Sequence, residues 1–309
     1  CQDVQGEIFD YPEEFFKERI HNIRRPKPDD FQIKQAMEKI KKSKKPIIIS
    51  GGGVFYSDAM DELGSFAIKH NIPVTQTVMG YSTMKRDHSH FLGPIGGLGG
   101  RAANNLAKET DLAICVGTKL ADFTTGSWAN FENPEFKLVS INIARHDANK
   151  HLAEAVIGDA KVCLSELSNS LGNWKSPDSW HKKSQDELKS WNEYVDKESG
   201  PTNQETPSYA HAVGAIYRNS DPTDIAVTAA GGLVGEVVQV WRPKELNTHE
   251  TEWGFSCMSY EISGALGIKM ANPDKDVIAF VGDGSYLLNN SDIYSSVLTN
   301  NKLIIIVCD

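Results

Sequence analysis

The amino-acid sequence predicts an α/β protein that contains two parallel-sheet, three-layer domains. Short apolar runs alternate with longer helical stretches in two separate series, which is the pattern of parallel strands covered by helices on both faces. A polar segment over residues 173–206 lies between the two series. At roughly 150 residues per domain, the chain of 309 residues also has the length of two domains.

Composition and charge exclude several classes of function. Hydrophobic residues make up 40% of the chain and charged residues 24%, as in ordinary globular proteins. The 32 basic and 41 acidic residues give a net charge of −9, the wrong sign for general attraction to nucleic acid or to an anionic membrane. No stretch approaches the ~18 consecutive apolar residues of a membrane-spanning helix. We therefore expect a soluble protein that binds neither nucleic acid nor a membrane.

The cysteines indicate a reducing compartment. They are odd in number, widely spaced and without a CxxC pair, so neither a disulfide framework nor a zinc site is indicated. The five are Cys1, Cys115, Cys163, Cys257 and Cys308. The chain begins on a cysteine without a leader and stops directly after an apolar run, and we interpret it as the middle of a longer cytoplasmic polypeptide.

The first domain is predicted over residues 29–172, after a proline-containing connector at 1–28 that would arrive from an upstream domain. Asp29 and Asp30 can cap its first helix, and the lysines at the end of that helix are expected to be solvated and to complement its dipole. Beyond it, short apolar runs predict strands and longer stretches with helical spacing predict helices. In chain order these are strand 47–49, helix 57–70, strand 74–75, helix 101–109, and strands 112–116, 138–143 and 155–157.

The second domain is predicted over residues 207–309. The polar linker before it, 173–206, is expected to contain a helix that lies against a domain surface. The same alternation of apolar runs and helical stretches then resumes. Its elements are helix 208–218, strand 225–229, helices 235–241 and 261–270, strand 277–281, helix 287–298 and strand 303–307.

Two glycine-rich turns in the first domain are weak candidates for anion binding. Residues 97–102 fit GxGxxA, and Asp122 lies about twenty residues later, as a dinucleotide-binding fingerprint requires. The fingerprint must follow a strand, however, and we expect residues 88–94 to form a loop. Residues 50–54 do follow a strand, so their amides could bind an anion, although a tight turn explains them as well.

The strongest motif is Gly282-Asp283-Gly284-Ser285, which leaves an apolar strand and enters a helix at about Leu287. Glycines let the backbone approach an anion closely, and the start of a helix offers unpaired amides to phosphate. Asp283 supplies a hard carboxylate oxygen suited to a divalent cation such as Mg²⁺ that could bridge a diphosphate. A purely structural turn is the alternative for this motif by itself.

This motif, together with the helix and strand predicted after it, resembles the thiamine diphosphate-dependent enzymes. In that family Gly-Asp-Gly is followed by a spacer and a strand that ends in asparagine, and both side chains bind one metal ion. The resemblance implies a central Rossmann-like domain and a truncated thiamine diphosphate-binding domain, with Asp283 as a Mg²⁺ ligand. It also implies that Gly282, Gly284 and Ser285 bind the cofactor. Asp309 takes the place of the first of two asparagines, and the metal-binding asparagine would be the next residue.

Two upstream segments extend the resemblance to this family. Met258 stands where the family places a bulky apolar side chain that holds the cofactor bent, which brings its reacting groups together. Ser259 replaces the glycine that commonly follows. Gly231 and Gly232 match the family's other phosphate-side turn. Core packing is the alternative interpretation of Met258.

Catalytic side chains are harder to identify. The family's activating glutamate is expected in the upstream domain. His249 and Glu252 are candidates in this chain because, with Glu250, they lie in a predicted loop before Met258. Solvated loop charge is the alternative. Four further histidines of the first domain have no metal-like spacing and are expected to be structural: His88, His90, His146 and His151.

Longer strings resemble one branch of the family, hydrolases of inositol catabolism that break a carbon–carbon bond in a cyclic diketone to give a deoxy sugar acid. The strings cover residues 1–5, 24–26, 122–127, 142–151 and 257–261. The resemblance implies thiamine diphosphate and Mg²⁺ as cofactors, a small cyclic diketone as substrate, and a homodimer or homotetramer with sites between subunits. The alternatives are a carboligase similar to acetolactate synthase and, from another class, a non-catalytic nucleotide-binding module.

Overall fold

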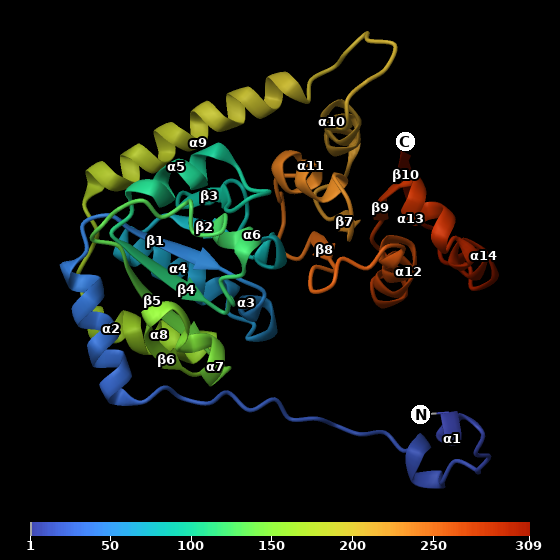
Figure 1. The fold of residues 1–309 in the computed structure, drawn as a ribbon, viewed down its shortest axis with the longest axis horizontal. Helices are drawn as coiled ribbons and strands as arrows, with labels where there is room; N and C mark the ends of the chain where they lie inside the picture. Colours follow the sequence, from blue (N-terminus) through green and yellow to red (C-terminus); the bar gives the residue numbers. More distant parts are fainter. Residues whose placement is uncertain (1) are drawn as a thin grey trace.

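The computed structural model describes residues 2–309 and contains two all-parallel sheets covered by helices, which confirms the predicted α/β class (Figure 1). The first sheet has six strands in the order β3-β2-β1-β4-β5-β6. Its strands are β1 (Pro46–Ser50), β2 (Val74–Gln76), β3 (Phe91–Pro94), β4 (Leu112–Val116), β5 (Lys137–Asn142) and β6 (Glu154–Ile157). This is the strand order of a doubly wound Rossmann sheet.

Helices cover both faces of the first sheet. Figure 1 shows α5 (Arg101–Glu109) and α9 (Asp178–Glu198) above it, with α2 (Asp30–Lys42) and α8 (Ala160–Leu171) below. The side chain of Asp29 caps α2 by accepting a hydrogen bond from the Phe31 N–H, as predicted. The helix expected within 173–206 is α9, whose buried Trp180 donates an indole hydrogen bond to Pro46 O at 2.8 Å.

Short helices complete the first part of the chain. They are α1 (Gln2–Gln5), η1 (Glu13–Phe16), α3 (Gly53–Tyr56), α4 (Met60–His70), η2 (Val78–Gly80), α6 (Asp122–Thr125), α7 (Arg145–Ala148) and η3 (Lys150–Leu152). The segment that contains α1 and η1 is exposed and runs away from the folded body (Figure 1). Cys1 lies outside the described residues.

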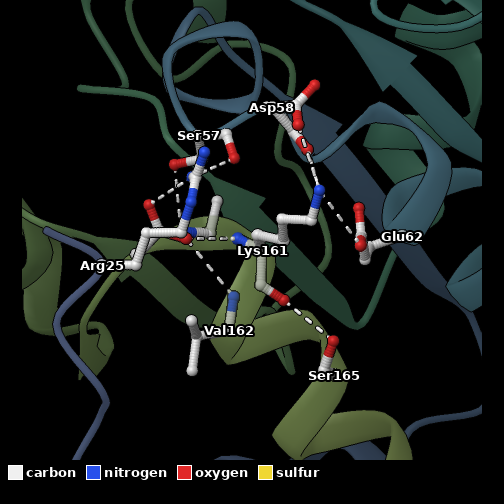
Figure 2. A network of polar contacts seen from close by, with 9 residues as sticks. Arg25, Ser57, Asp58, Glu62, Lys161, Val162 and Ser165 are labelled. Carbon is white, nitrogen blue, oxygen red and sulfur yellow. Dashed lines mark hydrogen bonds and ion pairs between the residues drawn. The ribbon is translucent and has the colours of Figure 1, made fainter. Parts of the chain in front are cut away.

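The helix predicted over 57–70 is wrong at its start, because the chain turns between α3 and α4. Asp58 has a left-handed φ of 50°, which interrupts the helix. Figure 2 shows why this turn is held: Arg25 donates to Ser57 O, and Lys161 Nζ donates to Asp58 O at 2.9 Å. Both partners come from distant parts of the sequence, so local periodicity does not reveal the break.

The second sheet has four strands in the order β10-β9-β7-β8. Its elements are α10 (Tyr209–Asn219), β7 (Ile225–Thr228), α11 (Leu233–Val240), β8 (His249–Thr251), α12 (Tyr260–Ala271), β9 (Val277–Gly282), α13 (Asp283–Leu288), α14 (Ser291–Leu298) and β10 (Ile304–Cys308). Alternate residues of β7 and β9 face opposite sides. Ile278 and Phe280 join the large core that includes α11, whereas Val277 and Ala279 pack with α12.

Two segments predicted as loops are edge strands. Phe91–Pro94 forms β3, and the segment with His249 forms β8. Both are short, and β3 contains Gly93 and Pro94, which are unfavourable in central strands and tolerated at an edge. In β8 the buried His249 and Thr251 flank the exposed Glu250, an alternation too short to predict a strand.

The predicted helix 287–298 is two helices. Asn289 leaves the helical region with φ −154° and ψ 83°, which separates α13 from α14. The first helix also begins four residues earlier than expected, because Gly282 is its N-cap and Asp283 its first residue. An acidic side chain in the first turn is favoured by the helix dipole.

The two sheets are joined through the segment that follows η2. The Ser82 carbonyl accepts from the Asn247 N–H at 3.3 Å, and the Arg86 N–H donates to Pro243 O at 2.8 Å. Tyr81 packs edge-to-face on His249 with ring centroids 5.3 Å apart. Burial lowers the pKa of His249 to about 4, so its imidazole is neutral at this joint at pH 7.

The cysteines and the helix lengths of the described residues give two further observations. Cys115, Cys163, Cys257 and Cys308 are free thiols. Among residues 2–309, no helix combines the length and apolar character needed to cross a bilayer.

The glycine turn after β1 is filled by protein. A Cβ on Gly51 would lie 2.4 Å from Gly117 O, and one on Gly53 would lie 2.6 Å from Gly117 Cα. The N–H of Gly51 donates to Val116 O and that of Gly53 donates to Gly117 O, both at 2.9 Å. These two amides are already paired, which favours the tight-turn interpretation over anion binding.

We predict that Gly51→Ala lowers the free energy of unfolding by about 2 kcal/mol or more, because the new methyl group overlaps the Gly117 carbonyl. Gly267→Ala is the control, since a Cβ there meets no atom within 4 Å and lies in a helix that alanine favours. Urea unfolding followed by circular dichroism gives both values. Equal stability of Gly51→Ala and the wild type would contradict the close packing of these turns.

The buried His249 predicts a specific pH dependence of stability. Its folded pKa of about 4 is below the ordinary value of 6.5. The unfolded state therefore binds a proton first, and stability falls as the pH drops from about 6.5 to about 4, on the order of 3 kcal/mol for this group. His249→Phe, which keeps a ring against Tyr81, should lose less stability over that range. Parallel curves of unfolding free energy against pH for the two proteins would refute the assignment.

Candidate functional site

A hollow of about 250 Å³ lies at the carboxyl ends of β7, β9 and β10. All the predicted cofactor-binding residues except Ser259 line it. The lining residues are Tyr209, Ala230, Gly231, Gly232, Leu233, Met258, Gly282, Asp283, Gly284, Ser285 and Cys308. They come from five segments that are far apart in sequence, namely the start of α10, the turn after β7, the segment before α12, the turn after β9 and the end of β10, and the parallel sheet brings them to one edge.

Two backbone turns of the hollow present unpaired N–H groups. In the described part of the chain, the amides of Gly231, Gly232 and Leu233 donate to no protein acceptor, nor do those of Gly284 and Ser285. A Cβ added at Gly231, Gly232 or Gly282 would meet no atom within 4 Å. Gly231 also has a φ of 77°, which favours glycine. The glycines therefore leave both turns accessible to a group that accepts several hydrogen bonds.

Asp283 stands at the entrance of α13 with its carboxylate exposed. Within residues 2–309 this carboxylate has neither a hydrogen-bond nor an ion-pair partner. The register pairs Cys308 with Gly282. Asp283 and Asp309 therefore come directly after paired residues of two neighbouring strands. The described residues contain no group of three or more His, Cys, Asp or Glu side chains that could hold a metal by themselves. An ion such as Mg²⁺ needs only one or two carboxylates and keeps its waters or a phosphate as further ligands.

Met258 faces the same hollow from the segment before α12. Its side chain is 49% exposed, and its Cε lies 3.4 Å from where a Cβ of Gly284 would be. Ser259 lies behind it, buried: its N–H donates to Ser285 Oγ at 3.2 Å, and its hydroxyl donates to Ser285 O at 2.8 Å. These two bonds tie the methionine segment to the Gly-Asp-Gly turn.

A buried glutamate supports the other turn. Glu261 is fully buried, and its Oε1 accepts a hydrogen bond from the Ala230 N–H at 3.1 Å. Its Oε2 has no hydrogen-bond partner among the described residues. No role was predicted from the sequence for Glu261, or for Tyr209 and Cys308 in the lining, and Ala230 and Leu233 were expected only as neighbours of Gly231 and Gly232 in their turn. A lone acidic residue among the apolar positions of α12 was the available signal for Glu261.

The two catalytic candidates do not line the hollow. His249 is buried on β8 between Tyr81 and Thr228, whose Oγ1 lies 3.4 Å from His249 Nε2. Glu252 follows β8, and its carboxylate accepts backbone hydrogen bonds from Phe255 and Cys257. Neither residue is therefore among those that surround the Gly-Asp-Gly turn in the hollow.

The GxGxxA turn has the strand that the sequence analysis did not expect, since β3 precedes it. Its glycines are nevertheless packed against protein: a Cβ on Gly99 would lie 2.4 Å from Ile95 C, and one on Gly100 would lie 2.7 Å from Trp191 Nε1. The N–H of Gly97 donates to Phe123 O at 2.7 Å. The start of α5 is covered by α9, so the geometry does not favour dinucleotide binding here.

Comparison with known families agrees with this geometry. Residues 33–167 match the description "Thiamine pyrophosphate enzyme, central domain". Residues 229–309 match "Thiamine pyrophosphate enzyme, C-terminal TPP binding domain". The second match includes every residue of the hollow except Tyr209.

Similar proteins match along the whole chain. It is 39% identical over 332 residues to a 3D-(3,5/4)-trihydroxycyclohexane-1,2-dione hydrolase of Clostridium tetani. It is 38% identical to proteins of the same name in Clostridium perfringens and Bacillus anthracis. In each case the match covers 100% of this chain and 52% of the relative, so the chain spans about half the length of these curated relatives.

Proposed function

The chain belongs to the thiamine pyrophosphate enzymes, and from this premise we propose that it forms the diphosphate-binding half of a hydrolase that opens trihydroxycyclohexane-1,2-dione. The proposal rests on the two turns of the hollow that present unpaired backbone N–H groups, residues 231–233 and the Gly-Asp-Gly turn that carries Asp283. The relatives' name supplies the substrate class. The proposed cofactors are thiamine diphosphate and Mg²⁺, and the proposed assembly is a homodimer or homotetramer.

The residues present fit a diphosphate with a divalent cation. Phosphate oxygens accept hydrogen bonds from backbone N–H groups at the start of helices, and α11 and α13 both begin at the hollow. The glycines leave room for close approach of the anion to the backbone. Asp283 offers the hard oxygen that Mg²⁺ prefers and makes no competing ion pair among the described residues.

Each part of the hollow then has a binding role. Gly231 and Gly232 on one side and Gly284 and Ser285 on the other would donate to the diphosphate, while Asp283 would hold the metal ion. Met258 would support the bent cofactor, as in the family that the chain resembles. When bound, thiamine diphosphate supplies a nucleophilic carbon that adds to a carbonyl and stabilises the charge released when the neighbouring carbon–carbon bond breaks.

The overall reaction balances with one water molecule. The bond between the two carbonyl carbons of the dione breaks, one carbon receives hydroxyl and becomes a carboxylate, and the other receives hydrogen and becomes an aldehyde. The product is an open-chain deoxy sugar acid. This chain's contribution is to hold the cofactor and metal and to present the apolar Met258 beneath the reacting centre.

The proposed function is tested by incubating the full-length protein, of which this chain would form half, with thiamine diphosphate, MgCl₂ and the cyclic dione in H₂¹⁸O. We expect an acid product heavier than the dione by one water, with ¹⁸O in its carboxylate. Parallel reactions contain pyruvate. A carboligation product from pyruvate, without hydrolysis of the dione, would contradict the proposal and favour the acetolactate synthase-like alternative.

In the full-length protein, Asp283→Asn should weaken Mg²⁺ and thiamine diphosphate binding together, roughly tenfold or more, because one ion would link the carboxylate to the diphosphate. The matched control is Asp274→Asn, another exposed aspartate, which lies outside the hollow. Calorimetric titration with thiamine diphosphate, at several Mg²⁺ concentrations, measures both affinities. Unchanged affinities in Asp283→Asn would remove Asp283 from the metal site.

A further inference from the structure

The segment between β8 and α12 is held in its conformation by the carboxylate of Glu252, a residue of the same segment. Glu252 Oε1 accepts the Phe255 N–H at 2.9 Å, and Glu252 Oε2 accepts the Cys257 N–H at 2.6 Å. The carboxylate makes no ion pair among the described residues. Both of its oxygens are therefore directed to the backbone of the loop that comes after it.

Glu252 is itself anchored to the second sheet. Its N–H donates to Thr228 O at 3.3 Å, at the end of β7. The sheet thus fixes the position of Glu252, and the carboxylate fixes the loop. Residue Ser256 within the loop has a φ of 55°, a conformation that a non-glycine residue adopts only when its surroundings hold it there.

Met258 lies between two fixed amides. The N–H of Cys257 is held by Glu252, and the N–H of Ser259 is held by the Ser285 hydroxyl. Met258 is half-exposed, so the surrounding residues cover only part of it. Its place beside Gly284 therefore depends on the backbone on both sides of it.

The hydrogen bonds from the Phe255 and Cys257 N–H groups depend on the negative charge of the Glu252 carboxylate. Burial by itself would raise the pKa of Glu252, but the N–H groups of Phe255, Cys257 and Gly254 outweigh it and lower that pKa below its usual range. The carboxylate is thus ionised at pH 7. In turn, desolvation raises the pKa of the Cys257 thiol, and the negative charge of Glu252 raises it further.

We propose that Glu252 is a positioning residue: its carboxylate clamps residues 255–257 and so sets Met258 in the hollow formed by the Gly-Asp-Gly turn. This inference rests on the proposed function for the role of Met258. It replaces a catalytic role for Glu252, since both carboxylate oxygens are already occupied by backbone donors.

The clamp is tested first without cofactor or substrate. In Glu252→Gln, hydrogen–deuterium exchange at the Phe255 and Cys257 amides should be at least tenfold faster. Alkylation of Cys257 by iodoacetamide at pH 8, read from the peptide that contains it, should also become faster because the thiol pKa falls. Cys257 is the exposed one of the four described cysteines. Glu250→Gln, at a neighbouring exposed glutamate that does not accept the Phe255 or Cys257 N–H, should change neither rate.

The second readout is kinetic. Glu252→Gln should lower kcat for the dione about tenfold and change thiamine diphosphate affinity less than threefold, because the diphosphate turns remain intact. Glu252→Asp, which keeps a carboxylate, should recover part of kcat and part of the amide protection. Unchanged exchange in Glu252→Gln overturns the clamp, and faster exchange with unchanged kcat overturns the positioning of Met258. A wild-type protein that shows the clamp and fails to open the dione overturns the proposed function instead.

Discussion

The parallel pairing of β7, β9 and β10 is the constraint on which the hollow depends. The register aligns Cys308 with Gly282, so the turns after these strands leave the sheet at one level. Parallel strands require crossover helices, and the following helices therefore begin at that same edge. Sheet geometry alone thus brings two sets of helix-start amides and the Asp283 carboxylate together. Without this register, the two sets of helix-start amides and the Asp283 carboxylate would not lie together in one site.

Buried or half-buried carboxylates hold the turns that the sheet leaves free. Glu261 supports the Ala230 turn, and Glu252 supports the segment that carries Met258. Ser256 and Ser259 have φ values of 55° and 76°, which cost about 1 kcal/mol or more each. Hydrogen bonds from the sheet and from Ser285 maintain these conformations. The carboxylates behind the hollow therefore fix the conformation of its turns. The backbone N–H groups and the Asp283 carboxylate at its surface remain free to bind a ligand.

The sequence predicted best those features that depend only on residues close to one another in the chain. The strands with apolar runs, the cap at Asp29 and the Gly-Asp-Gly turn were all predicted from neighbouring residues. Edge strands β3 and β8 were missed because three or four residues do not establish an alternation. The break at Asp58 depends on Arg25 and Lys161, which are distant in sequence. The roles of the site residues and the domain boundaries stay predictions.

We propose that the unpaired amides in the turns after β7 and β9, rather than the amides of the first-domain glycine turns, receive the diphosphate. Hydrogen–deuterium exchange of the full-length protein, with and without thiamine diphosphate and MgCl₂, distinguishes these two locations. We expect slower exchange on binding at residues 231–233 and 283–285, and no change at residues 51–53 or 97–100. Protection of either first-domain turn, with none at the Gly-Asp-Gly turn, would contradict it.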